Sequence, residues 1–136
     1  MPLPPPLNPP ELTEAEWAII KAVWDGEPCT APDVQERLAA ERQWTYSTVR
    51  TLMDRMAAKG LLQTERLRHL TLYRAAVTRA QAQQGELGYA LKTAFNGALT
   101  PMIQSLLDHH PLSERELDEL AALIRAKRNQ SARKKS

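Results

Sequence analysis

The segment at residues 44–62 reads Trp44-Thr45-Tyr46-Ser47-Thr48-Val49-Arg50-Thr51-Leu52-Met53-Asp54-Arg55-Met56-Ala57-Ala58-Lys59-Gly60-Leu61-Leu62. Apolar side chains recur along this segment at intervals of three or four residues, at Val49, Leu52, Met53 and Met56. That spacing places them on one face of a helix. Thr45 is a typical N-cap, and Gly60 is typical of the position just after a helix end. We therefore predict an amphipathic helix over residues 46–59.

The opposite face of this helix carries short hydroxyls and arginines and no large apolar group, at Ser47, Arg50, Thr51, Asp54, Arg55 and Ala58. Ser, Thr and Arg are the side chains that contact phosphates, and Arg and Thr also reach base edges in the DNA major groove. An ordinary amphipathic surface helix could carry the same residues. The DNA interpretation therefore depends on the remainder of the chain.

Charge is distributed unevenly along the 136 residues, although the formal net charge is only +2. Residues 1–41 hold two Lys or Arg and eight Asp or Glu, whereas residues 42–74 hold seven and two. Residues 75–124 hold three and six, and residues 125–136 hold six and none. Such segregation indicates a polyanionic partner for the basic segments.

Several other classes of protein are not expected. The single cysteine, Cys29, allows neither an internal disulfide nor a zinc site, and the three histidines lack metal-ligand spacing. We find no nucleophile–base pair and no Gly-rich phosphate loop, so we predict neither an enzyme nor a cofactor. The sequence has no apolar run of membrane-spanning length and no signal-peptide pattern, so we expect a soluble cytoplasmic protein without a membrane partner. A redox role for Cys29 remains an alternative.

Two further helices are expected before the central one. A Pro-rich segment over residues 1–11 is predicted to be extended or disordered. Thr13 and Glu16 form a capping-box pattern, and the helix that they begin ends at Gly26. Thr30, Pro32 and Asp33 then begin a second helix. Three helices with short connections, the last one polar on its outer face, are typical of a helix-turn-helix.

The periodicity changes after Gly60. Residues 62–66 and 70–74 are two short β-like runs, joined by Leu67-Arg68-His69. Two strands that follow a recognition-type helix form a wing, and Arg66, Arg68 and His69 near its tip would lie over a phosphate backbone or an adjacent minor groove. A solvated hairpin without such contacts is the alternative. We predict a winged-helix domain over residues 12–76, with three helices and a two-stranded wing.

Helical periodicity returns after Thr78. We expect one helix to about Phe95, a second before His109-His110-Pro111, and a third that begins with the Ser113/Glu116 capping box. These helices cannot bury their apolar stripes alone, so residues 77–127 are predicted to form a two-fold homodimer. Folding back onto the winged domain is the alternative, and residues 128–136 are predicted to be a basic disordered tail. The expected dimer contacts are Leu87, Leu91, Phe95, Leu99, Met102, Ile103, Leu106, Leu107, Leu117, Leu120 and Ile124.

The predicted DNA-binding surface combines the central helix, its flanks and the wing. Its members are Arg42, Thr45, Tyr46, Ser47, Thr48, Arg50, Thr51, Arg55, Lys59, Arg66, Arg68 and His69. The competing hypothesis is a winged-helix module that docks proteins through its acidic first segment. Such a module would bind duplex DNA weakly and with little dependence on salt.

Three motifs together resemble the penicillinase-repressor family, which includes the BlaI, MecI and CopY regulators. They are Leu12-Thr13-Glu14-Ala15-Glu16-Trp17, Trp44-Thr45-Tyr46-Ser47-Thr48-Val49-Arg50-Thr51-Leu52, and Lys59-Gly60-Leu61-Leu62 with Tyr73. The resemblance spans roughly residues 11–125. It implies a homodimeric repressor that binds a palindromic, inverted-repeat operator in duplex DNA, with Thr45, Tyr46, Ser47, Thr48 and Arg50 at the contacting helix start.

The chain also departs from these relatives. Its wing lacks their usual Gly at Leu67-Arg68-His69-Leu70, and it lacks the paired Cys-x-Cys motifs of the copper-sensing branch, so a copper response is not expected. Resemblance to the β-lactam branch makes an inducing protease a candidate partner. However, Gln104-Ser105-Leu106 does not match the Asn-Phe pair that is cleaved there, so no cleavage site is assigned.

Overall fold

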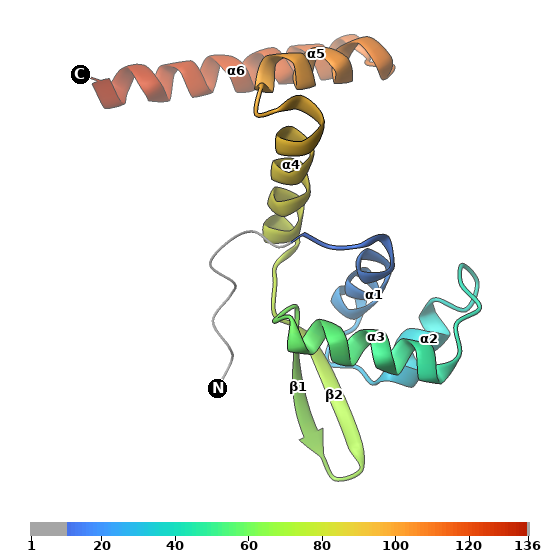
Figure 1. The fold of residues 1–136 in the computed structure, drawn as a ribbon. Coiled ribbons are helices and arrows are strands. Elements are labelled where there is room, and N and C mark those ends of the chain that lie inside the picture. Colours follow the sequence, from blue (N-terminus) through green and yellow to red (C-terminus); the bar gives the residue numbers. More distant parts are fainter. Residues whose placement is uncertain (1–10, 136) are drawn as a thin grey trace. The chain divides into compact units, whose positions relative to one another are not determined.

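The computed structural model describes residues 11–135, so most of the Pro-rich segment predicted over residues 1–11 lies outside the described part of the chain. The elements are α1 (Glu14–Asp25), α2 (Ala31–Arg37), α3 (Tyr46–Ala58), β1 (Leu62–Leu67), β2 (Leu70–Ala75), α4 (Arg79–Phe95), α5 (Leu99–His109) and α6 (Glu114–Lys135) (Figure 1). This is the mainly helical, winged helix-turn-helix architecture that the sequence predicts. Among the described helices, none is both long enough and apolar enough to cross a membrane.

The chain divides into two compact units, residues 1–90 and 91–136. We predicted a boundary at residue 77, but the division falls within α4. The first turns of α4 belong to the first unit because they pack against α1. Trp24 Nε1 donates to the Val77 carbonyl at 3.1 Å, and the guanidinium of Arg79 lies 4.7 Å from the centre of the Trp24 ring.

The core of the first unit forms where α1, α2, α3 and the wing converge. The capping box predicted at Thr13 begins α1, with reciprocal backbone–side-chain hydrogen bonds to Glu16 of 2.9 and 3.2 Å. Thr30 caps α2 in the same way with Asp33. The buried apolar side chains are Leu12, Ile19, Ile20, Ala22, Val23, Cys29, Ala31, Val34, Leu38, Val49, Met53, Met56, Leu61, Leu62, Tyr73, Val77 and Ala82.

Three of the four apolar residues predicted for the inner face of α3 are fully buried. Val49, Met53 and Met56 have no exposed surface, and Leu52 packs partly buried against the same core. The side-chain oxygen of Thr45 accepts a hydrogen bond from the Thr48 N–H at 3.2 Å, which confirms it as the N-cap. The opposite face of α3 is therefore left to solvent.

The wing is an antiparallel hairpin, as predicted, in which Leu62 pairs with Ala75 and Leu67 with Leu70. This register leaves a two-residue turn at Arg68-His69. Arg68 has φ 58°, in the left-handed region that a Gly would occupy more favourably. On its other side, β2 pairs briefly with the α1–α2 connection, because Cys29 and Tyr73 exchange two backbone hydrogen bonds of 3.1 and 2.7 Å.

The helices after the wing begin and end at predicted signals. Thr78 caps α4 reciprocally with Gln81, and Asn96-Gly97 ends it with φ 51° and 84°. Ser113 and Glu116 form the capping box of α6. The disordered tail predicted from residue 128 is not found, because α6 continues to Lys135. Ala, Gln, Lys and Arg favour helix, the segment contains neither Gly nor Pro, and cations are favourable near a helix C-terminus.

Candidate nucleic-acid interface

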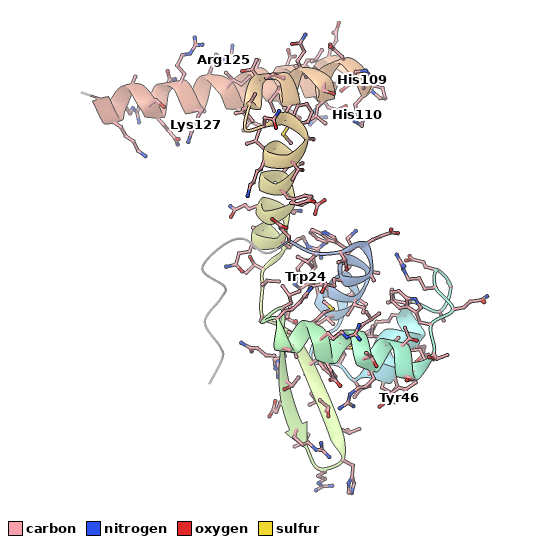
Figure 2. All side chains as sticks on the ribbon, viewed as in Figure 1. Trp24, Tyr46, His109, His110, Arg125 and Lys127 are labelled. Carbon is pink, nitrogen blue, oxygen red and sulfur yellow. The ribbon has the colours of Figure 1, made fainter. Side chains whose placement is uncertain are left out.

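The outer face of α3 is an open polar surface. Tyr46, Ser47, Thr48, Thr51 and Arg55 are all exposed, and Tyr46 is labelled on α3 in Figure 2. These are five of the twelve residues predicted to contact DNA. The inner residues Val49, Met53 and Met56 hold the helix on the core, so the outer side chains are presented from a rigid element.

Arg50 lies at the junction of α3 and the wing. Its Nε donates to Asp54 Oδ2 at 3.1 Å, one turn further along α3, and its Nη2 donates to Thr71 Oγ1 on β2 at 3.4 Å. The hydrogen bond to Asp54 is the main reason that the pKa of Arg50 is raised above its usual range, with a further contribution from the bond to Tyr46. The contact with Thr71 makes the outer face of α3 and the wing one continuous surface.

Asp54 and Tyr73 hold Arg50 in this position, and the sequence did not identify either as part of the site. Tyr73 is fully buried, and its hydroxyl donates to Asp54 Oδ1 at 2.7 Å. Burial and this hydrogen bond both raise the pKa of Tyr73, so the phenol stays protonated and donates. Asp54 therefore accepts from two elements at once. In the sequence, the only sign that Asp54 belongs to the site was its position four residues after Arg50, which permits an ion pair along a helix.

Besides Arg50, two other cations predicted to contact DNA have partners inside the protein. Lys59 Nζ lies 2.6 Å from Glu16 Oε2, and Arg42 Nη2 lies 3.1 Å from Glu14 Oε1 while its guanidinium stacks 4.8 Å from the Trp44 ring. Glu16 is buried, with only 6% of its side chain exposed. Burial tends to raise the pKa of Glu16, but hydrogen bonds from Lys59 and Thr13 outweigh it and lower the pKa.

The tip of the wing is basic and apolar together. Arg66, Arg68 and His69 are exposed, as are the cross-strand neighbours Leu67 and Leu70, each with about half of its surface accessible. The positive charges predicted for the wing therefore project beyond the core. The described residues contain no group of three or more His, Cys, Asp or Glu side chains that could hold a metal ion.

Comparison with known proteins identifies the family to which this fold and this surface belong. The sequence model of the penicillinase repressor matches residues 12–126, which is most of the chain. The chain belongs to the penicillinase-repressor family. It is therefore placed among DNA-binding repressors.

Individual members of the penicillinase-repressor family match over nearly their whole length. The methicillin resistance regulatory protein MecI of Mammaliicoccus sciuri is 21% identical over 117 residues, covering 86% of this chain and 95% of the relative. The penicillinase repressor of Bacillus licheniformis is 22% identical over 120 residues, covering 88% and 94%. A solution structure of B. licheniformis BlaI, in monomeric form in complex with the blaP half-operator, has a TM-score of 0.47 and 20% identity over 54% of this chain and 90% of that one.

The predicted dimer interface draws its side chains from α4, α5 and α6. Leu91, Phe95 and Met102 are partly buried. The other eight are exposed in the single chain: Leu87, Leu99, Ile103, Leu106, Leu107, Leu117, Leu120 and Ile124. Clusters of exposed apolar side chains are uncommon on the surface of a monomeric protein.

Proposed function

We propose that this protein is a transcriptional repressor that binds an inverted-repeat operator as a homodimer and blocks transcription by occupying the promoter. The observation that carries the proposal is the hydrogen bond from Arg50 on α3 to Thr71 on β2, which joins the helix face and the wing into one basic surface. A winged helix that places such a helix in the major groove can contact the phosphate backbone with its wing.

The residues predicted to contact DNA differ in the hydrogen bonds and ion pairs that they already form within the protein. Ser47, Thr48 and Thr51 are exposed, and none of them forms a hydrogen bond to a carboxylate in the described part of the chain. Their hydroxyls can therefore bind base edges or phosphates. Arg55, Arg66 and Arg68 are exposed cations suited to phosphates. Lys59 already neutralises the buried Glu16, so we assign it mainly to the fold, whereas Arg42 pairs with the exposed Glu14 and can exchange that contact for a phosphate.

Two copies of α3 are needed to read an inverted repeat. The exposed apolar side chains of α5 and α6 supply a surface on which a second copy can pack. In a two-fold dimer the two α3 helices would enter successive major grooves about 34 Å apart, or a small multiple of that distance. Occupation of both half-sites excludes polymerase from the same DNA, which is the simplest route to repression.

Binding to duplexes from the promoter of the protein's own transcription unit, followed by fluorescence anisotropy across a range of salt, tests this function. We expect one inverted repeat to be bound tightly and to resist competitor DNA, and a scrambled duplex to be bound weakly with a steep salt dependence. Equal binding to both duplexes would reject sequence specificity. A sedimentation experiment at the same concentrations reports whether the operator-bound species is a dimer.

A protein-docking role is the second candidate, and a groove between α1 and α2 favours it. The groove has a volume of about 700 Å³ and is lined by Trp17, Lys21, Arg37, Leu38 and both acidic and basic neighbours. A docking module would show no salt-sensitive affinity for any duplex. It would instead lose partner binding when Trp17 is replaced by Ala, with DNA binding absent in both forms.

A further inference from the structure

The long helix α6 separates its charges along its length. Its first turns carry Glu114, Glu116, Asp118 and Glu119, whereas its second half carries Arg125, Lys127, Arg128, Arg133 and Lys134. Figure 2 labels Arg125 and Lys127 on this helix. Acids near the N-terminus and cations near the C-terminus also suit the helix dipole, so segregation alone does not imply a partner.

An apolar row lies between the two charged halves, and no other residue between 11 and 135 covers it. Leu117, Leu120 and Ile124 recur at helical spacing on one face, with between 39% and 61% of each side chain exposed. No described side chain of α5 or α6 is buried. The row is therefore free to pack against another molecule, and its middle falls near Ala121.

Glu114 and Arg128 lie at equal distances on either side of this midpoint. They are separated by fourteen residues, about four helical turns, which places both on the same flank of the apolar row. Neither forms an ion pair with another described residue, whereas Glu119 is already paired with Arg115 at 3.3 Å. Positions equidistant from a two-fold axis face each other in a symmetric dimer.

We propose that the α6 helices of two copies pair antiparallel about Ala121, with Glu114 of each copy facing Arg128 of the other. The inference rests on the homodimer proposed above and adds its orientation and register. Two identical charge pairs would flank a shared apolar row. A parallel pair would bring the two acidic ends of α6 together and the two basic ends together, and like charges gathered in this way destabilise a helix pair.

Cross-linking of full-length chains tests the orientation. A chain with Glu114→Cys is mixed with a chain with Arg128→Cys and treated with a short thiol-to-thiol linker, while the unsubstituted chain, whose Cys29 is buried, serves as the control. We expect cross-links between the two different variants. In a parallel pair these two thiols would be about 21 Å apart, at 1.5 Å per residue.

The products distinguish the two levels of the proposal. Cross-links of each variant only with itself would overturn the antiparallel register and leave the homodimer intact. A wild-type chain that sediments as a monomer would overturn the homodimer itself. Operator binding is measured on the same preparations, so a failure of the register is separable from a failure of the proposed function.

Charge reversal gives an independent measurement. We expect Glu114→Arg to weaken the dimer on the order of ten-fold, since two like-charge contacts are created per dimer, and the double variant Glu114→Arg/Arg128→Glu to recover most of that loss. Asp118→Arg, which lies away from the apolar row, is the matched control and should have a smaller effect. The absence of recovery in the double variant would overturn the proposal, because loss of a favourable helix-dipole charge alone cannot be rescued from residue 128.

The alternative is that the basic end of α6 binds DNA. Truncation of this end distinguishes a role in dimerisation from a role in DNA binding. Removal of residues 127–136 should weaken the dimer, although less than Arg128→Glu, because the truncation removes the charge pair without setting like charges against each other. Unchanged dimerisation together with a lower affinity for scrambled duplex would overturn the register proposed here and assign this end of α6 to DNA.

Discussion

The buried hydroxyl of Tyr73 donates a 2.7 Å hydrogen bond to Asp54, and the same carboxylate accepts from Arg50. This relationship connects the core side of the wing to the outer face of α3. It means that Arg50 is not a free side chain, because Asp54 orients its guanidinium and the buried Tyr73 in turn holds Asp54. The consequences for binding and stability can be measured separately.

Arg50 is expected to contribute to recognition of the operator. Arg50→Ala should weaken operator binding by about 1–3 kcal/mol if the guanidinium contacts a base. The measurement is a pair of anisotropy titrations, one on operator and one on scrambled duplex. An equal loss on both would assign Arg50 to a phosphate.

Replacing Asp54 should raise the affinity for non-specific DNA and lower the discrimination between operator and scrambled duplex. Asp54→Asn removes a negative charge from the DNA-facing surface, so affinity for scrambled duplex should rise. The same change releases Arg50 from its 3.1 Å ion pair, so discrimination between operator and scrambled duplex should fall. Glu36→Gln, an exposed acid on α2, is the control for charge alone. If the ratio of the two affinities is unchanged in Asp54→Asn, Asp54 does not position Arg50.

Tyr73→Phe should lower the free energy of unfolding by about 1–2 kcal/mol, since a hydrogen bond to a charged group is lost within a buried site. Tyr46→Phe removes a hydroxyl from an exposed ring and should change stability very little. Urea denaturation followed by tryptophan fluorescence compares the two variants. Equal effects would show that the Tyr73 hydroxyl adds nothing specific to the core.

Glu16 should make the free energy of unfolding decrease as the pH falls into the acid range. Its pKa in the folded protein is lowered below the ordinary value of 4.5, so the carboxylate stabilises the fold above that value. The stabilisation is lost as the pH falls through 4.5 and then through the lower folded pKa. Denaturation at pH 7 and pH 3 should show a smaller pH effect in Glu16→Gln than in wild type. Glu14→Gln, whose side chain is 92% exposed, should behave like wild type.

Arg68 is held in a left-handed conformation at the wing turn. Arg68→Gly should raise the free energy of unfolding by about 1 kcal/mol, because a residue with a Cβ is disfavoured at φ 58°. It should also lower the salt dependence of DNA binding by about one unit of slope if Arg68 contacts a phosphate. Arg66→Ala should reduce the slope similarly without a gain in stability. A loss of stability in Arg68→Gly would contradict the backbone argument.

The features that could be predicted from the sequence are those in which the interacting residues lie close together along the chain. The capping boxes at Thr13 and Ser113 and the N-caps at Thr30 and Thr45 were readable because each involves residues within three positions of one another. The two wing strands were readable from short β-like runs, but their register was not predicted, and the turn is one residue shorter than the expected joint at residues 67–69. The helical tail was misjudged because charge suggested disorder, while the local preference of its residues for helix was the stronger factor.

By itself, the sequence determined the elements, their caps and the family, since periodicity, capping and turn residues act locally. Only the tertiary structure decided which cations face outward. Lys59 turns to Glu16, 43 positions away, and Arg42 turns to Glu14, 28 positions away, whereas Arg50 is set by Tyr73 through Asp54. Such pairs form when packing brings distant segments together, and in the case of Glu16 packing also buries the acid, which then requires a partner. No local pattern records that choice.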